Sequence, residues 1–546
     1  MNEPPHGRLP RTVRELVLLG LVLLFAAAMF TFRLGAGSLW DLDESRYAQV
    51  SREILMTGDP VTMHLNGKPW FGPPPFWMWL QAVTGWAFGF SEFTTRAWAA
   101  IFGVLGVAAT YTLGREWFGP RTGLLGGLIL TTMLEYLLLS RLAVVDVVQA
   151  AFMLLALHAF YRGYRDRGSG DYLRGFLYSG LATLTRGPIA FVLPALVLVL
   201  FLAARRALDR WREVPWGWGA LLYLGVAAPW YVLETARSGS VFLSAAFGGE
   251  SLGRLTRAAG AQAASVLYHV PVLILGAVPW TAFLPGALVY HSVRRWQDGS
   301  LICLVWCGVA FLLAVALGGR LPDGVFLIYP LAAIAVARLW EDFLFEGGRY
   351  LRRALVTSFI LQIGVALFVA VAGAAFATVR YPREFAAVRG AFIPPLAALV
   401  VGPAVTAVLF RYRRYTAAFL ALPATMAAFV GILYTITVPA VETQKPMKPL
   451  AAALKLELRP GDRIIGYRIG TPASLIYYTN HSVEPVGDPA VLRERLCDSG
   501  RVFLVTTREE LATAHAELPP GLLQVADRGE IVVKVKPAAL ACGGEA

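Results

Sequence analysis

Apolar segments of about 20 residues, long enough to cross the hydrocarbon core of a bilayer, recur from Leu16 to beyond Tyr434. This repetition constrains the fold more than any other feature of the chain. Of the 546 residues, 57% are hydrophobic, a share that is typical of membrane proteins. The sequence therefore predicts a polytopic α-helical membrane protein.

The apolar segments indicate about thirteen transmembrane helices. The first of them is too long for a removed signal peptide and lacks a small-residue cleavage site. We expect the spans near residues 14–33, 96–113, 122–139, 147–163, 173–186, 188–205, 217–233, 265–289, 300–318, 324–341, 353–376, 391–411 and 415–438.

The count depends on Thr185-Arg186-Gly187-Pro188, which interrupts the apolar stretch from Gly175 to Ala204. Arg186 in the middle of one long span would be costly, and Gly-Pro is a natural break. Two short spans instead place Arg186 at a membrane surface. This split also puts the Arg clusters between spans in the cytoplasm, as the positive-inside rule requires: Arg8/Arg11/Arg14, Arg162/Arg165/Arg167, Arg205/Arg206/Arg210/Arg212, Arg294/Arg295, Arg349/Arg352/Arg353 and Arg411/Arg413/Arg414. The N-terminus is then cytoplasmic and the C-terminus extracytoplasmic.

The net charge of +13 has the same origin. The Arg clusters would meet anionic headgroups, so membrane lipids are expected partners. These Arg residues are scattered between spans and form no single stripe, which argues against nucleic-acid binding.

The composition changes near residue 441, and we expect two domains, 1–440 in the membrane and 441–546 outside it. Helical patterns at 448–458, 489–497 and 508–518 alternate with strand patterns at 463–469, 474–479, 501–506 and 530–535. This alternation predicts a small extracytoplasmic α/β domain. Cys497 and Cys542 fall in this oxidising compartment, where they could form a disulfide or stay free.

Charged residues collect on the predicted external face. A guanidinium group can bind phosphate oxygens with two hydrogen bonds, and a carboxylate can act as a general base. The face therefore suits a lipid with a phosphate headgroup. Its members are Asp43, Glu44, Arg46, His64 and Lys68 on a long first loop with expected amphipathic surface helices, Arg141, Asp146, Arg186 and Arg320 at shorter turns, and Glu250 and Arg254 on the loop 234–264.

Each of these residues also has a simpler interpretation. The acidic pair Asp43-Glu44 could offset the dipole at a helix start, and Asp146 could cap the fourth span. Lys68 and Arg320 could extend to lipid headgroups. Glu250 and Arg254 are spaced as an ordinary helical ion pair.

Several motifs, in order, resemble one family of membrane enzymes. The first loop carries four of them: Leu42-Asp43-Glu44-Ser45-Arg46-Tyr47-Ala48, Gly58-Asp59, Leu65-Asn66-Gly67-Lys68-Pro69-Trp70-Phe71 and Pro73-Pro74-Pro75. Further motifs follow along the chain: Gly180-Leu181-Ala182 with Thr185-Arg186-Gly187-Pro188, Pro279-Trp280-Thr281 and Gly319-Arg320-Leu321-Pro322. Together they are similar to the protein-mannosyltransferase-like (GT-C type) membrane glycosyltransferases, and most of all to the aminoarabinose transferases that modify lipid A.

The resemblance implies an activity and a set of roles. Family members transfer a sugar from a polyprenyl-phosphate carrier to an acceptor at the outer face of the cytoplasmic (inner) membrane, usually with inversion. By this likeness Asp43 is the catalytic acid and Asp146 the second acid of the site. Glu250 and Arg254 match the family's His-Glu-His-x-x-Arg segment. No cofactor is implied.

The chain also departs from the family pattern. The aminoarabinose transferases have Glu-Lys where this chain has Gly72-Pro73, and His-Glu-His where it has Gly249-Glu250-Ser251. Because the Glu and the first His are the expected metal ligands, the sequence predicts no metal site. A different sugar or acceptor from that of the lipid A enzymes is also expected.

Two other functional classes compete with the transferase. A lipid or solute transporter of the flippase type is expected to carry charge at mid-membrane between broken helices, often in repeated halves. This chain shows no repeat, and its charge collects at one face. A scaffold protein without catalysis would have no need of that acidic and basic face.

Overall fold

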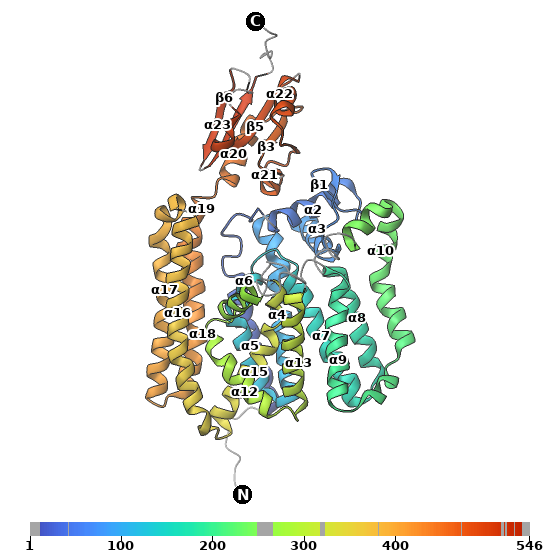
Figure 1. Cartoon of the computed structure of the whole chain (residues 1–546), viewed down its shortest axis with the longest axis vertical. Helices are drawn as coiled ribbons and strands as arrows, with labels where there is room; N and C mark the ends of the chain where they lie inside the picture. The colour runs from blue at the N-terminus through green and yellow to red at the C-terminus, as the bar shows by residue number, and fades with distance from the viewer. Residues whose placement is uncertain are drawn as a thin grey trace. The chain divides into compact units, whose positions relative to one another are not determined.

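The computed structural model of the chain describes residues 11–41, 43–247, 266–316, 323–380, 382–470, 472–498, 500–514, 518, 521–528 and 530–537 (Figure 1). The chain forms two compact units. Unit 1 comprises Met1–Leu34, Phe71–Trp77 and Arg96–Thr435, and unit 2 comprises Gly35–Trp70, Met78–Thr95 and Ile436–Ala546.

Unit 1 is a bundle of apolar helices, because only a helix satisfies every backbone hydrogen bond of a single segment in lipid. Within the described residues, seven helical segments are long and apolar enough to cross a membrane, and an eighth results if the bent pair Val266–Gly276 and Thr281–Val293 is one span. The chain is therefore a polytopic helical membrane protein, as predicted. The seven contain α1 (Arg11–Thr31), α4 (Glu92–Phe118), α13 (Asp298–Ala316), α14 (Asp323–Phe326) with α15 (Tyr329–Phe345), α16 (Arg352–Arg380), α17 (Pro382–Arg411) and α18 (Tyr415–Ile432).

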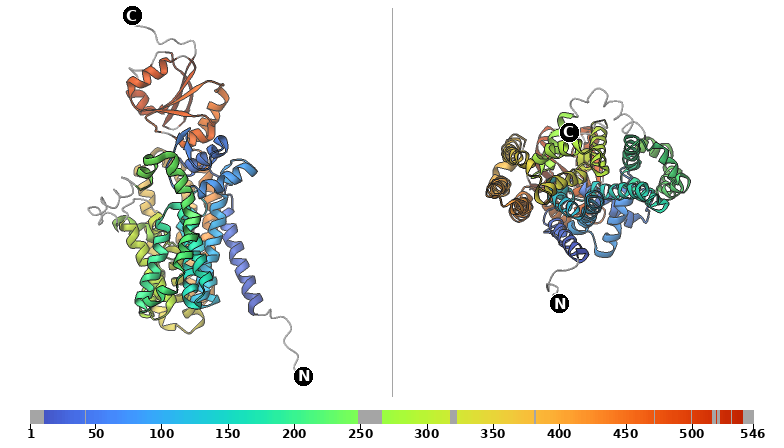
Figure 2. Two further views of the ribbon diagram at one scale, coloured as in Figure 1. Left: turned by 90° about the vertical axis from the view of Figure 1, so that its right-hand side faces the viewer. Right: turned by 90° about the horizontal axis from the view of Figure 1, so that it is seen from below.

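Five further helices of unit 1 are shorter or more polar: α5 (Pro120–Thr132), α7 (Asp146–Asp166), α8 (Ser169–Arg186), α9 (Ile189–Ala204) and α10 (Trp216–Phe247). The predicted break at Gly187-Pro188 is confirmed, since α8 ends and α9 begins on either side of it. Gly187 has φ +105°, a conformation that favours glycine. α7 packs along α8, and α5 packs along α15. Figure 2 shows α1, in dark blue, at the periphery of this unit.

Three predicted segments of unit 1 differ from the structure. The expected span 122–139 is two helices, α5 and α6 (Leu134–Leu139), because Met133 between them has an extended backbone. The expected span 265–289 bends by 111° near Gly276. The prediction of a loop from Glu234 onward is wrong over its first part, because α10 continues to Phe247 with a kink at Gly239.

Unit 2 contains a five-stranded mixed sheet in the order β4-β3-β5-β7-β6. β3 (Arg463–Tyr467) pairs in parallel with β4 (Val483–Val486) and β5 (Val502–Thr507), whereas β7 (Ile531–Lys536) runs antiparallel to β5 and β6 (Leu523–Arg528). Successive strand residues face opposite sides. Ile464 and Phe503 therefore pack with α20 (Met447–Glu457) and α21 (Ala473–Thr479), and Ile465 and Leu504 pack with α22 (Pro489–Cys497).

Part of the secondary structure predicted for this segment was wrong. Residues 474–479 were predicted as a strand and form α21, because a short apolar run cannot be assigned from periodicity alone. The edge strand β6 carries several polar residues and was missed, as was β4. The last predicted helix, 508–518, is shorter and ends as α23 (Arg508–Thr513). Cys497 is disulfide-bonded, and Cys542 lies outside the described residues, so their pairing stays a prediction.

The rest of unit 2 comes from the loop that follows α1. It contains α2 (Glu44–Thr57), the hairpin of β1 (His64–Leu65) and β2 (Lys68–Pro69), and most of α3 (Phe76–Phe88). Contacts inside the unit join this loop to the C-terminal segment: the Asp41 carboxylate accepts a hydrogen bond from the Ser474 amide at 3.0 Å. The predicted functional division at residues 440 and 441 stays a prediction.

Candidate active site

Asp43, the predicted catalytic acid, stands at the first turn of α2 in unit 2. It occupies the N-cap position, but its side chain makes no capping hydrogen bond. Its Oδ1 lies 3.7 Å from Nη1 of Arg46, and the two side chains keep 48% and 39% of their accessible surface. The carboxylate is therefore half exposed and lies next to a cation.

Glu44 differs from its neighbour. It is buried, and its Oε2 accepts a hydrogen bond from the Trp40 amide at 3.1 Å. This bond closes the turn that leads into α2. Of the two adjacent acids, Asp43 thus faces outward, and Glu44 shapes the backbone that presents it.

The hairpin with His64 and Lys68 is held by Glu53, a residue that the sequence analysis did not single out. The buried Glu53 carboxylate accepts hydrogen bonds from the backbone amides of Asn66 at 2.8 Å and Gly67 at 3.0 Å. Asn66 and Gly67 both have positive φ, as two-residue hairpin turns require. The Asn-Gly pair was the sequence signal for this hairpin.

Two side chains fasten α2 and the hairpin to the rest of unit 2. Arg52 donates to the Tyr477 carbonyl at 2.6 Å, and its guanidinium lies 4.2 Å from the Tyr477 ring centroid. Burial lowers the pKa of Arg52 below its ordinary value, and the contacts with Tyr477 offset only part of this effect. The Asn66 side-chain amide donates through Nδ2 to the Val483 carbonyl at 2.6 Å, and its Oδ1 accepts a hydrogen bond from the Val483 backbone amide at 3.0 Å. These contacts hold α2, which begins next to Asp43, to the C-terminal part of unit 2.

In unit 1 the structure brings two predicted site residues together. Asp146, the first residue of α7, forms an ion pair with Arg186, the last residue of α8. Their side chains keep 9% and 29% of their accessible surface. The acid lies at a positive helix N-terminus and the cation at a negative helix C-terminus, so both helix dipoles favour the arrangement.

The neighbourhood of this pair includes α10, which packs against α8. A Cβ at Gly187 would come within 3.9 Å of the Tyr231 hydroxyl. On the same helix the carboxylate of Glu234 is buried and accepts a hydrogen bond from the Ser238 hydroxyl at 2.6 Å. The sequence placed Glu234 in a loop, so its burial was not anticipated.

Arg141 is almost completely buried in unit 1. Nη2 donates to the Phe32 carbonyl at 2.5 Å, and Nη1 donates to the Met29 carbonyl. Its guanidinium carbon lies 3.7 Å from the ring centroid of Tyr434. These contacts satisfy carbonyls at the C-terminal end of α1, which lack partners within the helix.

The remaining predicted site residues, Glu250, Arg254 and Arg320, lie outside the described residues, as does Gly249. Gly72, at the other position where the family pattern has a ligand, is exposed. Across the described part of the chain, no group of three or more His, Cys, Asp or Glu side chains is placed to hold a metal ion.

Comparisons with known proteins agree with the motifs. Residues 72–232 match the family described as dolichyl-phosphate-mannose-protein mannosyltransferase. The chain is 28% identical to the undecaprenyl phosphate-alpha-4-amino-4-deoxy-L-arabinose arabinosyl transferase of Edwardsiella ictaluri, over 60% of this chain and 60% of the relative. It is 30% identical to arabinosyl transferase 2 of Sodalis glossinidius, over 59% and 58%. The chain thus spans about three fifths of the length of these relatives.

Solved structures match over a longer part of the chain. The crystal structure of ArnT from Cupriavidus metallidurans bound to undecaprenyl phosphate matches 98% of this chain and 100% of its own, with a TM-score of 0.81 and 22% identity. An oligosaccharyltransferase of Archaeoglobus fulgidus matches 93% of this chain and 71% of its own, with a TM-score of 0.55 and 14% identity. The resemblance inferred from the motifs is confirmed: residues 72–232 match the dolichyl-phosphate-mannose-protein mannosyltransferase family, and the chain has the fold of ArnT.

Proposed function

We propose that this protein transfers a sugar from a polyprenyl-phosphate carrier to a lipid, glycan or protein acceptor at the outer face of the cytoplasmic membrane. The observation that carries the proposal is the Asp146–Arg186 ion pair. It lies within the segment that matches the mannosyltransferase family, and the curated relatives are named as undecaprenyl-phosphate arabinosyl transferases.

The proposed reaction is a single displacement. Asp43 accepts the proton of the acceptor hydroxyl, whose oxygen forms a bond to the anomeric carbon of the sugar. The bond from that carbon to the phosphate oxygen breaks, and the polyprenyl phosphate leaves with both bonding electrons. Attack opposite the leaving phosphate inverts the configuration. A positioned base typically accelerates such a step by ~10²–10⁴-fold.

Arg186 supplies positive charge to the leaving phosphate. A guanidinium group binds phosphate oxygens through paired N–H donors, so Arg186 is the proposed phosphate ligand beside Asp146. Asp146 therefore positions the cation. Arg254 is the second proposed phosphate ligand, and Arg46, His64, Lys68, Glu250 and Arg320 are proposed to contact the donor or the acceptor.

Two predicted substrate ligands take a different role in this proposal. Both Nη atoms of Arg141 donate to carbonyls at the end of α1, and its guanidinium stacks on Tyr434. The Glu44 carboxylate accepts a hydrogen bond from the Trp40 amide in the turn before α2. We assign both to the support of the site.

The proposed topology has thirteen spans, with the N-terminus inside and residues 441–546 outside. The structure supports seven or eight of these spans; we assign the others to the five shorter or more polar helices α5, α7, α8, α9 and α10. A cysteine replacing the exposed Lys455 should react with a membrane-impermeant maleimide on intact spheroplasts. The matched variant Arg295→Cys should react only after permeabilisation, and the reverse pattern would contradict the topology.

The proposed enzyme needs no metal ion, because glycines stand at two positions where the family pattern has ligands. Turnover should stay within about twofold after incubation with a strong chelator, since metal-assisted stabilisation of charge is worth several kcal/mol where it operates. Metal analysis of the purified protein is the companion measurement. Stoichiometric zinc, together with loss of turnover on chelation, would contradict this expectation.

Mass spectrometry of envelope lipids and glycans tests the function as a whole. Cells that carry the gene should contain a species heavier by one sugar residue than its counterpart in cells without the gene. Cells without the gene should also accumulate the carrier-linked sugar. Identical lipid and glycan masses in both strains, with no change in the carrier pool, would refute the transferase.

A further inference from the structure

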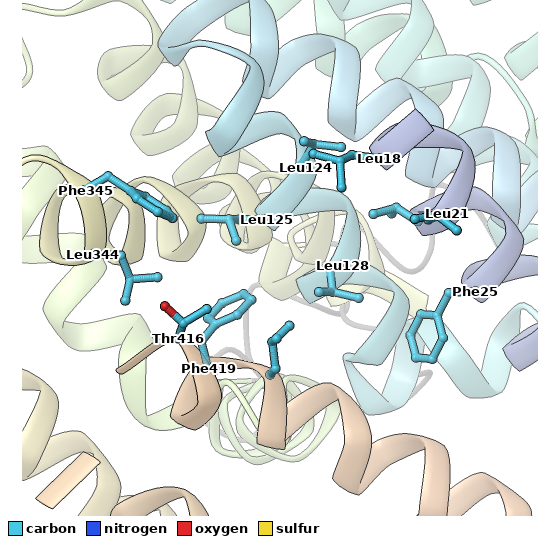
Figure 3. Close-up of a pocket in the computed structure, with 12 residues that line it drawn as sticks. Leu18, Leu21, Phe25, Leu124, Leu125, Leu128, Leu344, Phe345, Thr416 and Phe419 are labelled. Carbon is cyan, nitrogen blue, oxygen red and sulfur yellow. The ribbon is translucent and has the colours of Figure 1, made fainter. Parts of the chain in front are cut away.

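An apolar groove lies between four helices of unit 1, and none of the residues of the proposed active site lines it. Its volume is about 290 Å³, and it is lined by residues of α1, α5, α15 and α18, all of them apolar except Thr416. Figure 3 shows side chains of the four helices pointing into a common space, among them Leu21, Phe25, Leu125, Phe345 and Phe419.

Arginines precede this groove on three of the helices. Arg14 stands four residues before Leu18 on α1, and Arg121 four residues before Leu125 on α5. Residues four apart lie on the same helix face. Arg413 stands three residues before Thr416, just ahead of α18. Three helices that begin at this end of the groove thus each bring a cation to it.

These cations have no acidic partner of their own. In the part of the chain that the structure describes, Arg14, Arg121 and Arg413 make no side-chain hydrogen bond or ion pair, and all three are exposed. The Arg121 guanidinium lies 4.8 Å from the ring centroid of Phe345, which lines the groove. One cation is therefore held directly at the mouth of the apolar space.

Nearby carboxylates already have cationic partners, although Glu341 and Glu346 share Arg338. Glu346, next to Phe345, accepts hydrogen bonds from both Nη atoms of Arg338 at 2.8 and 2.7 Å. Glu15, next to Arg14, pairs with Arg115 at 2.5 Å. The end of the groove therefore keeps a net positive charge.

We infer that this groove binds an anionic glycerophospholipid, with an acyl chain among the leucines and phenylalanines and its phosphate among Arg14, Arg121 and Arg413. An apolar slot closed by unpaired guanidinium groups at headgroup level matches that chemistry. In the proposed topology these helix ends lie at the cytoplasmic surface. A polyprenyl phosphate shares the chemistry, but the reaction requires its phosphate at the opposite surface.

Native mass spectrometry tests the inference directly. The full-length protein is placed in nanodiscs of equal parts phosphatidylglycerol and phosphatidylethanolamine, and the lipids that remain bound after release are identified. One phosphatidylglycerol should be retained in preference to phosphatidylethanolamine. Arg121→Gln and Arg413→Gln should each weaken this retention roughly fivefold, as expected for one cation near an anionic surface. Arg121→Lys should keep most of it.

The groove and its rim have matched controls. Leu125→Trp fills the apolar space and should abolish retention, whereas Leu288→Trp on an exposed face of α12 (Leu284–Val293) should not. Arg295→Gln, exposed and outside the groove, should leave retention unchanged. A thermal unfolding curve for each variant shows whether it is folded. Equal retention of both phospholipids, or retention of a co-purified polyprenyl phosphate in this groove, would overturn the inference.

Discussion

Replacing Asp43 by Asn is expected to reduce turnover by ~10²–10⁴-fold, the usual contribution of a positioned general base. The side chain keeps its shape, and Asn is as good an N-cap residue as Asp. The helix should therefore be preserved, all the more because the Asp43 side chain makes no capping hydrogen bond. Donor binding should persist, because the change removes only the acceptor of the proton.

Asp41→Asn is the matched control for this variant. It lies on the same turn, and its Oδ1 accepts a hydrogen bond from the Ser474 amide, which an Asn oxygen can also accept. Turnover should stay within about twofold of the wild type, as for surface changes away from the site. If Asp43→Asn kept more than about a tenth of the wild-type turnover, the loss would be too small for removal of a base. Asp146 would then become the leading candidate.

The second large effect is expected at the Asp146–Arg186 pair. Arg186→Gln leaves the Asp146 carboxylate buried without its cation, and removal of one partner of a buried pair costs ~3–5 kcal/mol. Because the Arg186 side chain keeps 29% of its surface, we expect about 2–3 kcal/mol of unfolding free energy to be lost. Turnover should fall as well, because the leaving phosphate loses its cation.

A double variant separates the structural from the chemical role. Asp146→Asn combined with Arg186→Gln removes both charges and should recover most of the stability, but not the turnover. Arg174→Gln on the same helix is the control: its side chain keeps 63% of its accessible surface, so its pairing with Asp171 should contribute less than about 1 kcal/mol. Denaturant unfolding in detergent and single-turnover kinetics provide the two readouts. Recovery of turnover in the double variant would make the pair purely structural.

Much of the membrane fold could be predicted because the bilayer imposes a simple rule on sequence. Apolar length identified the helical segments, and the Gly187-Pro188 break followed from the cost of placing Arg186 in lipid. The bends at Met133 and near Gly276 could not be predicted in this way. The count weighed apolar length alone. Glu135 lies two residues after Met133, and Gly276 and Pro279 lie at the second bend, but residues of these types also occur inside continuous helices of this chain, so they do not by themselves locate a break.

The soluble part was harder to assign because packing decides its short segments. Residues 473–479 have a strand-like composition, yet Leu475, Ile476 and Tyr477 are all buried in a helix that fits between the sheet and α2. A single sequence offers no signal for such a tertiary choice.

The candidate site shows the same limit. The sequence placed Asp146 and Arg186 on one face, and the structure pairs them. The sequence could not show that Arg141 donates to carbonyls at the end of α1, or that Glu53 holds the hairpin, because both depend on distant backbone atoms. Residue type indicates what a side chain can bind, whereas its partner is known only from the fold.

The central claim is that Asp43 is the general base for sugar transfer from a polyprenyl-phosphate carrier. Its most direct test is release of the free carrier by purified protein in vesicles, supplied with the polyprenyl-phosphate-sugar fraction and the envelope lipids of the same cells. Wild-type protein should convert the donor to polyprenyl phosphate and add one sugar mass to an acceptor, while Asp43→Asn should do so at least about a hundredfold more slowly. Equal release by both proteins, or sugar-linked carrier moved across the vesicle membrane without being consumed, would contradict the account.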